Sequence, residues 1–297
     1  MELMKQRMLI LTHVHKNSAR CPTTVISLGT LVSISKEVSK MPIFQLFEPA
    51  NVRGYVHDHD YLEKTQEDIY LESVGLLNIS LEKAKGIELR TLGQTKNKLW
   101  HEHRSMRITS SHFGRICKAT ERTDLNKLAD ELLNPKPFHA KATDHGIKYE
   151  TEAVRKYEEK LKCKVNQSGL FVSHDFPYLG ASPDGITSSG VLLEVKCPYK
   201  ARGMEITNKT VPYMKKRDNV LLLNEYHNYY YQVQGQLFCT SAQFCDFFVY
   251  SIADSKVLRI QRDDKFISSM VAKLQAFYRQ FFEPKLLNKH FYNDYRG

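Results

Sequence analysis

Three charged residues in and beside an apolar stretch are the part of the sequence best suited to chemistry. The segment "GASPDGITSSGVLLEVKCPY", residues 180–199, carries Asp184 directly after a proline. Glu194 and Lys196 then follow inside a run that is otherwise typical of a buried strand. Burying unpaired carboxylates costs several kcal/mol. Charges at these positions therefore indicate a functional site.

The expected geometry brings these three side chains together. Side chains alternate along a strand, so Glu194 and Lys196 share one face. The turn "ITSSG" is short enough to form a hairpin, which brings Asp184, expected at the end of the preceding strand, beside Glu194. Neighbouring carboxylates repel unless a cation lies between them, and hard oxygen ligands in a wet pocket favour Mg²⁺. Lys196 can hold and deprotonate an attacking water or neutralise charge on a phosphate, as a nuclease requires.

A structural interpretation of the same residues stays open at this point. Glu194 and Lys196 can form an ion pair on an exposed strand, with Asp184 as an ordinary turn residue. The continuous apolar character of the strand favours a site, because a central strand is buried on both faces. Pro183 and Gly185 also fix the backbone around Asp184, as a ligand position requires.

Helical patterns precede this segment. Residues 60–72 and 80–104 are rich in charged helix formers with spaced leucines and are expected to form two helices. Thr109 or Ser110 can cap a short helix that begins in "RITSSHFGRICKAT", and another helix is expected in residues 124–134. A longer helix is expected from about Asp144 to residue 163. Its inward stripe comprises Tyr149, Ala153, Val154, Tyr157 and Leu161.

The pattern changes to that of strands between residues 163 and 198. A tyrosine-rich helix is expected over 224–240, then strands over 245–252 and 256–262, and a final helix over 265–283. Helices on both sides of short, hairpin-linked strands predict an α/β (α+β) fold with a central mixed sheet flanked by helices.

Composition limits the partners and the compartment. The 297-residue chain is 42% hydrophobic and carries a net charge of +10, which favours nucleic acid or an anionic membrane surface as partner. No stretch approaches about 18 consecutive apolar residues, so no membrane-spanning segment is expected, and the expected partner is DNA and not a membrane. The six cysteines form no C-x-x-C pair. This pattern predicts an intracellular protein, nuclear or cytoplasmic and not secreted.

Four motifs together resemble a known nuclease family. "SPDG" followed by "LLEVKCPY" is similar to the signature of the PD-(D/E)XK superfamily in the form carried by the YqaJ viral recombinase and lambda-type exonuclease family. "LWHEHRSMRITSSHFGRI", "HGIKYETEAVRKYEE" and "YYYQVQGQL" are similar to further motifs of that family, in the same order. The resemblance implies a restriction-endonuclease-like core in residues 61–297, with residues 1–60 as a region of unknown role.

The resemblance also implies a set of metal ligands. Glu150 corresponds to the helix glutamate that faces the metal ions, and it lies on the inward side of its helix. The complete implied set is Glu150, Asp184, Glu194 and the backbone carbonyl of Val195. The ions expected are two Mg²⁺, with Mn²⁺ as the alternative. Glu150 alone is equally consistent with an acidic residue in the first turn of a helix.

Catalytic roles come from the same comparison of motifs. Lys196 matches the catalytic lysine, and Gln232 matches a glutamine that orients this lysine or the attacking water. Gln234 is close to Gln232 in sequence but points about 200° away on a helix, so it ranks lower. The clusters "HDHD" at 57–60 and "HEH" at 101–103 are expected to be surface residues, because side chains at these spacings do not converge on one ion.

Arg104 and Ser111 fall on the positions that lambda-type enzymes use to hold a 5′-phosphate. A guanidinium binds phosphate in a bidentate way, and a hydroxyl at a helix start adds a donor. The alternative is that Arg104 belongs to a charged helix face and Ser111 only caps. The sequence departs from the family at Ser110, where alanine is usual, and residues 205–224 have no counterpart.

The sequence therefore predicts a metal-dependent DNA nuclease, a 5′-to-3′ exonuclease that acts on duplex ends in recombination or DNA processing. The alternatives are an endonuclease of the same superfamily and a DNA-binding recombination protein with an inactive site. The partners expected are DNA, a single-strand-annealing protein and further copies of the chain in a ring.

Overall fold

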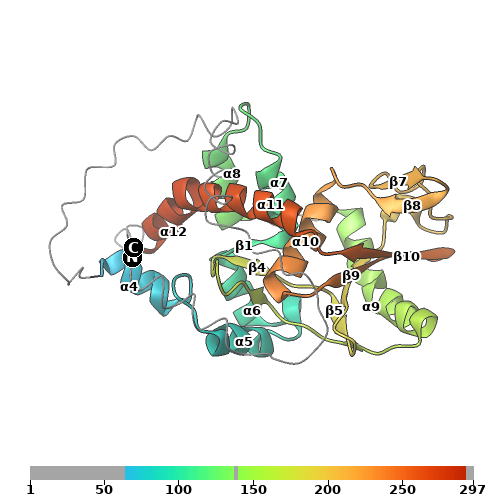
Figure 1. The fold of residues 1–297 in the computed structure, drawn as a ribbon, viewed down its shortest axis with the longest axis horizontal. Helices are drawn as coiled ribbons and strands as arrows, with labels where there is room; N and C mark the ends of the chain where they lie inside the picture. Colours follow the sequence, from blue (N-terminus) through green and yellow to red (C-terminus); the bar gives the residue numbers. More distant parts are fainter. Residues whose placement is uncertain (1–63, 137–139, 292–297) are drawn as a thin grey trace, which may run out of the picture. The chain divides into compact units, whose positions relative to one another are not determined.

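The computed structural model describes residues 64–136 and 140–291 (Figure 1). The region expected at 1–60 lies outside the described residues. The helices are α4 (Gln66–Ser73), α5 (Leu81–Arg90), α6 (Lys98–Ser105), α7 (Ser110–Cys117), α8 (Leu125–Leu133), α9 (Lys141–Leu161), α10 (Asn228–Thr240), α11 (Asp264–Phe277) and α12 (Glu283–Phe291). Within the described ranges, none of these helices combines the length and the apolarity needed to span a membrane.

The strands of the described part form a mixed α/β architecture. They are β1 (Ile108–Thr109), β2 (Val165–Asn166), β3 (Phe171–Val172), β4 (Leu179–Ala181), β5 (Gly185–Thr187), β6 (Leu192–Lys196), β7 (Met214–Arg217), β8 (Val220–Leu223), β9 (Phe244–Ser251) and β10 (Asp254–Gln261). The central five-stranded sheet has the order β10-β9-β6-β5-β2. Strands β6 and β9 are parallel and the other pairs are antiparallel. The predicted mixed sheet is thus confirmed.

Helices cover both faces of this sheet. On one face, Ala153 and Tyr157 of α9 pack against Leu193 and Val195 of β6. On the other, apolar residues of α10 share a core cluster with Leu192 and with residues of β9. Strand β6 is therefore buried between two helices, which explains its nearly continuous apolar sequence.

A smaller sheet continues the fold toward the remaining helices. Its order is β1-β4-β3, with β1 parallel to β4. Apolar residues of α7, α8, α11 and α12 form a core cluster with β1 and β4, and residues of α5 and α6 form another with β3. Strand β4 leads directly toward β5, so this part of the fold sets the position of the segment that contains Asp184.

Several predicted boundaries differ from the structure for local reasons. The helix expected over 80–104 divides into α5 and α6, because Gly93 takes a positive φ of 82° and Asn97 caps α6 through the backbone N–H of Leu99. Leu161, predicted in the inward stripe, is the last residue of α9 and is 39% exposed. The strand residues expected over 163–174 belong to two different sheets.

Helices α7 and α10 approach closely at Gly114, which gives a test of the packing. A Cβ at this position would lie 2.8 Å from Asn228 Cα and 2.7 Å from Asn228 Oδ1. Gly114→Ala is therefore expected to lower the free energy of unfolding by about 1–3 kcal/mol, measured by urea denaturation. Gly86→Ala in α5 is the control, because a Cβ there meets nothing within 4 Å. This control is expected to stabilise, and equal effects of the two substitutions would contradict the packing described.

Candidate active site

The hairpin of β5 and β6 holds Asp184 beside the middle of β6. Its antiparallel register pairs Gly185 with Leu193. The backbone N–H of Asp184 donates to the carbonyl oxygen of Leu193 at 3.0 Å, and Asp184 Oδ2 accepts from the backbone N–H of Val195 at 2.6 Å. The predicted hairpin is confirmed, although Asp184 directly precedes β5 instead of ending β4.

Residues far away in the sequence fix the turn that leads into Asp184. Trp100 Nε1 of α6 donates to Ser182 Oγ at 2.9 Å. Gln94 Nε2 donates to the carbonyl oxygen of Pro183 at 2.7 Å. The backbone around Asp184 is thus held from outside the hairpin, as a residue with a precise role requires.

Glu194 is a buried carboxylate whose two oxygens both accept hydrogen bonds. It lies at the centre of β6 and is 2% exposed. Its Oε1 accepts from Lys196 Nζ at 2.5 Å and from Gln232 Nε2 at 2.7 Å. Its Oε2 accepts from Gln236 Nε2 at 2.5 Å. Because charge-assisted hydrogen bonds stabilise an ionised carboxylate, these partners offset the cost of burying Glu194.

The sequence-based interpretation missed Gln236. It lies one helical turn after Gln232 on α10, and this spacing places both amides on the same face of the helix. Gln236 is fully buried, and its Oε1 has no hydrogen-bond partner within the described part of the chain. By contrast, Gln234 donates to the carbonyl oxygen of Gln261 and accepts from the backbone N–H of Asp263, so it points away as predicted.

Lys196 carries its charge into a cavity next to an aromatic ring. Its Nζ lies 4.5 Å from the ring centroid of Tyr229. Burial by itself lowers the pKa of Lys196, but the charge of Glu194, its hydrogen bond to Lys196 and the charge of Asp184 outweigh burial, so the pKa lies above its ordinary value. The ammonium group therefore stays protonated at neutral pH.

Asp184 and Glu150 have perturbed acidities with a common origin. The pKa of Asp184 is well above its ordinary value because of burial and the negative charge of Glu194, while Lys196 acts in the opposite direction. Desolvation and the charge of Glu194 likewise raise the pKa of Glu150 on α9. The negative charges of Asp184, Glu150 and Glu194 therefore repel one another. The positive charge of Lys196 offsets this repulsion only in part.

Asp246 is a second buried acid, and hydrogen-bond donors, including a guanidinium group, surround its carboxylate. Asp246 of β9 is completely buried. It accepts hydrogen bonds from Arg259 Nε and Nη2 at 2.8 and 2.9 Å, and from Tyr157 Oη at 2.7 Å. Among the described residues, no side-chain cation forms an ion pair with Asp184, which distinguishes it from Asp246.

Asp184, Glu150 and Lys196 line a cavity of about 320 Å³. Its wall includes Glu150 and the preceding turns of α9, together with Asp184 and Lys196. Cys197 also lines the cavity, but burial, followed by the charges of Glu150 and Asp184, raises the pKa of its thiol to about 12. A raised pKa disfavours the thiolate that nucleophilic cysteine chemistry needs. The cavity is suited to a ligand that needs both acidic and cationic contacts.

The residues of this cavity fit a divalent cation that keeps part of its water shell. Within residues 64–136 and 140–291, no group of three His, Cys, Asp or Glu side chains could by itself hold a metal ion. However, Mg²⁺ usually takes only one or two protein carboxylates and completes its shell with waters and substrate phosphates. Asp184 and Glu150 offer such hard oxygens. The predicted ligand roles of Glu194 and of the Val195 carbonyl stay predictions.

The two residues predicted to bind a 5′-phosphate, Arg104 and Ser111, lie on α6 and α7. The guanidinium of Arg104 on α6 stacks 4.2 Å from the ring centroid of Trp100, and burial lowers its pKa to about 10. Ser111 is exposed in the first turn of α7, 3.3 Å from Thr109 Oγ1. Burial, followed by the charge of Arg104, lowers the pKa of His112 to about 4.

Arg104 and Ser111 are separate from the acidic cavity. In the described part of the chain, no hydrogen bond or ion pair joins either of them to Asp184, Glu194 or Lys196. The connection is indirect, because Trp100, on which Arg104 stacks, also donates to the turn before Asp184. Their predicted role in binding a 5′-phosphate stays a prediction.

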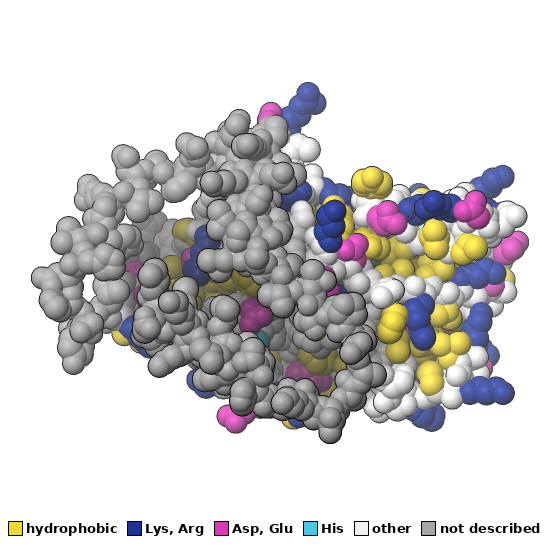
Figure 2. Space-filling model, in the orientation of Figure 1, with side chains coloured by type: hydrophobic (Ala, Val, Ile, Leu, Met, Phe, Trp, Pro, Cys, Tyr) yellow, Lys and Arg dark blue, Asp and Glu magenta, His cyan; other side chains and the backbone are white. Residues whose placement is uncertain are grey.

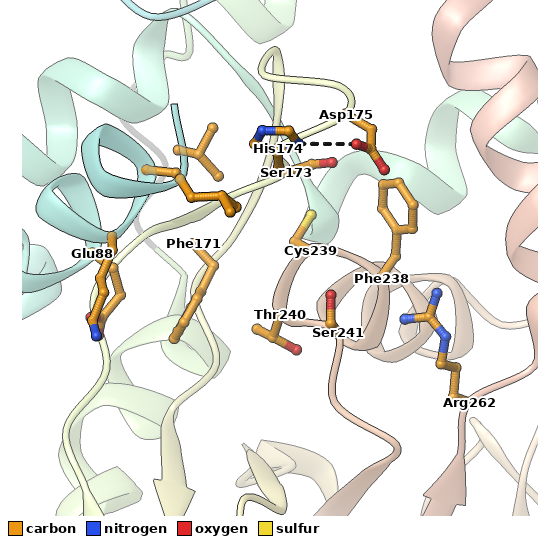
Figure 3. Close-up of a pocket in the computed structure, with 14 residues that line it drawn as sticks. Glu88, Phe171, Ser173, His174, Asp175, Phe238, Cys239, Thr240, Ser241 and Arg262 are labelled. Carbon is orange, nitrogen blue, oxygen red and sulfur yellow. Dashed lines mark hydrogen bonds and ion pairs between the residues drawn. The ribbon is translucent and has the colours of Figure 1, made fainter. Parts of the chain in front are cut away.

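A different cavity, of about 470 Å³, lies between α5, β3 and the end of α10 (Figure 3). Phe171 and Phe238 contribute apolar walls, and His174 forms an ion pair with Asp175 at its edge (Figure 3). Cys239 is buried here, which raises the pKa of its thiol. This cavity is larger, and Lys85, Glu88 and Asp175 contribute to its lining, but within the described residues no ion pair joins these three side chains, so volume alone does not identify the site.

The fold defines the class of architecture. A mixed central sheet enclosed by α9 and α10 is a restriction-endonuclease-like arrangement. The crystal structure of the alkaline exonuclease LHK-Exo from Laribacter hongkongensis is similar, with a TM-score of 0.52 and 24% identity, over 64% of this chain and 95% of that chain. Its complex with dAMP gives a TM-score of 0.52 and 25% identity, over 64% and 96% of the two chains.

The sequence match points to the same family. Residues 99–243 match the family model of the YqaJ-like viral recombinase domain. An uncharacterized protein of Acanthamoeba polyphaga mimivirus is 29% identical over 222 residues, which cover 69% of this chain. The match spans 37% of the mimivirus protein. The predicted resemblance to this family is therefore confirmed.

The hydrogen bond from Gln236 to Glu194 can be tested by stability measurements. Gln236→Leu removes the donor to the buried Oε2 and is expected to lower the free energy of unfolding by about 1–3 kcal/mol, measured by urea denaturation. The control is the same substitution in a Glu194→Gln background, where no buried charge is left without its donor. An equal loss of stability in both backgrounds would contradict the coupling of the two residues.

Proposed function

We propose that this protein is a metal-dependent nuclease that hydrolyses phosphodiester bonds of DNA, and that it acts as a 5′-to-3′ exonuclease on duplex ends. The observation that carries the proposal is the cavity in which Asp184 and Glu150 face the ammonium group of Lys196 within a YqaJ-like domain. The similar exonuclease LHK-Exo has been crystallised with dAMP, which supports a nucleotide ligand for this fold.

The side chains have distinct tasks in this proposal. Asp184 and Glu150 hold Mg²⁺, with Mn²⁺ as the alternative, and the sequence motifs favour two ions. A bound divalent ion supplies Lewis acidity and lowers the pKa of a bound water. Lys196 neutralises negative charge on the phosphate, because its ammonium group lines the cavity. Glu194, held by Gln232 and Gln236, positions Lys196 through their hydrogen bond.

The wider role follows from charge and family. The net charge of +10 supports a nucleic-acid partner, and the YqaJ-like domain supports a role in recombination or DNA processing. A single-strand-annealing protein and further copies of the chain, arranged in a ring, are the proposed protein partners. The cysteines of the described part are all free, which supports a reducing intracellular compartment, nuclear or cytoplasmic.

Substitution of the central groups tests the nuclease function. Asp184→Asn and Lys196→Met are each expected to reduce hydrolysis of linear duplex DNA by at least about 100-fold, because each removes an electrostatic group that acts on the reacting phosphate. Release of acid-soluble nucleotides with Mg²⁺ is measured, and EDTA is expected to abolish it. The control Asp175→Asn removes an exposed acid from the other cavity and is expected to keep full activity.

The same assay separates the alternatives. A closed circular duplex is expected to survive an exonuclease, whereas its cleavage would favour an endonuclease. Wild-type protein that binds DNA but hydrolyses neither substrate with Mg²⁺ or Mn²⁺ would favour a DNA-binding recombination protein with an inactive site. In that case the proposed function is wrong.

Binding of a 5′-phosphate by Arg104 and Ser111 predicts a preference for DNA ends that carry this phosphate. Wild-type protein is expected to digest linear duplex DNA with a 5′-phosphate faster than the same DNA with a 5′-hydroxyl. Arg104→Gln is expected to reduce this preference by about 10-fold, because a charged hydrogen bond to the phosphate is lost. Initial rates on both substrates are compared, with Arg115→Gln as the control, since Arg115 pairs with Glu131 on the surface. An unchanged preference in Arg104→Gln would exclude a role for Arg104 in binding the 5′-phosphate.

A further inference from the structure

The segment of residues 205–224, which has no counterpart in the family motifs, contains a well-defined β-hairpin. Strands β7 and β8 pair from Met214 with Leu223 to Arg217 with Val220. Asp218 and Asn219 connect them with φ of 47° and 63°. Two successive positive φ values are typical of the type I′ turn, which matches the twist of paired strands. The hairpin is therefore a regular ribbon.

One face of this ribbon is anchored in the core. Met214, Leu223 and the partly buried Leu221 share an apolar cluster with Phe247 and Val249 of β9. Strand β8 also contacts β10 of the central sheet. Because the inner face is packed in this way, the ribbon has a fixed position relative to the sheet.

The opposite face of the ribbon is exposed and combines aliphatic with cationic side chains. Lys215 is paired with Leu222 and Arg217 with Val220, so these side chains share the outer face. Val220 is 57% exposed and Leu222 is 37% exposed. Figure 2 shows hydrophobic side chains beside Lys and Arg over the region where Figure 1 labels β7 and β8. Val220 and Leu222 therefore form a small aliphatic patch flanked by two cations.

The ribbon begins at the wall of the candidate active site. Tyr213, directly before β7, lines the cavity, and its ring packs against Tyr229 with 4.9 Å between centroids. Tyr229 in turn lies under the ammonium group of Lys196. Four extended residues span about 14 Å at about 3.4 Å each. This length corresponds to about four nucleotides along one strand of a duplex.

The charge of this region favours a polyanion. Residues 199–226 carry six cations and three acids. The cations are Lys200, Arg202, Lys209, Lys215, Lys216 and Arg217, and the acids are Glu205, Asp218 and Glu225. Lys215 and Arg217 form ion pairs with Glu225 and Asp218 at 3.2 and 3.8 Å, between side chains that are at least 36% exposed. Such exposed pairs contribute little, so both cations can exchange their acid for a phosphate.

We infer that the outer face of the β7–β8 ribbon binds the duplex next to the scissile phosphate, with Lys215 and Arg217 on the backbone and Val220 and Leu222 against groove atoms. The inference rests on the proposed function and extends it to a contact for double-stranded substrate. A two-stranded ribbon fits the major groove of B-DNA. Single strands are bound mainly by exposed aromatic rings, and this face has none. Its four outward side chains are also far fewer than the roughly 20–30 residues that each partner contributes to a stable protein interface.

The experiment compares paired substitutions in the full chain. Affinities for a 20-base-pair DNA duplex and for one of its strands are measured by fluorescence anisotropy in EDTA, where no turnover occurs. The variants are K215S/R217S and V220S/L222S. The control is R155S/K156S, which removes two exposed, acid-paired cations from the outer side of α9. Thermal melting confirms that each variant folds.

The inference expects three results. K215S/R217S weakens duplex binding by about fivefold or more at physiological salt and reduces the slope of log Kd against log salt by about 1–2, since about 0.9 counterions are released per phosphate contact. V220S/L222S weakens duplex binding by about threefold or more and leaves this slope unchanged. Both variants lose less affinity for the single strand, and the control binds within about twofold of wild type.

Other outcomes overturn the inference. Hairpin variants that bind the duplex as tightly as the control would exclude the contact, and so would equal losses for duplex and single strand. A change confined to the oligomeric state of V220S/L222S, measured by light scattering, would assign the face to a second copy of the chain. Because binding is measured without turnover, a wild-type protein that binds but never hydrolyses DNA contradicts the nuclease function alone.

Discussion

The buried carboxylate of Glu194 is the group on which the candidate site depends. An anion at the centre of a sheet is tolerated only when hydrogen-bond donors surround it. Lys196 comes from the same strand, but Gln232 and Gln236 come from α10, so this helix must pack tightly over β6. The glycine contacts between α7 and α10 help to set that position. The burial of Glu194 and the position of Lys196 therefore both depend on the packing of α10 over β6.

The acids near the central sheet differ in how well they are neutralised. Glu194 and Asp246 are buried with several donors, which is the behaviour of acids that a fold can hold permanently. Asp184 and Glu150 face a cavity, and the charge of Glu194 contributes to the rise in the pKa of each. Perturbed acids in a cavity beside a lysine are typical of a site that acts on a charged ligand. The contrast within one sheet supports the assignment of the cavity.

Elements outside the central sheet connect the site to its surroundings. Trp100 of α6 donates a hydrogen bond to the turn before Asp184, and its ring stacks with the guanidinium group of Arg104. One side chain therefore contacts both the predicted 5′-phosphate-binding residue and the turn that leads into the β5–β6 hairpin. On another side, Tyr213 links the cavity to the β7–β8 ribbon. Each link joins the cavity to a surface that bears basic side chains.

The sequence alone determined the class of fold, the β5–β6 hairpin and the common face of Glu194 and Lys196, because strand alternation and turn length are local properties. The family motifs added Gln232 and Glu150, which no local pattern distinguishes from ordinary helix residues. Only the tertiary structure decided that Gln236 completes the bonding of Glu194, that Trp100 and Gln94 fix the turn before Asp184, and that the unmatched segment forms a ribbon at the cavity. These contacts join elements far apart in the chain, and their geometry depends on how the helices pack against the sheet.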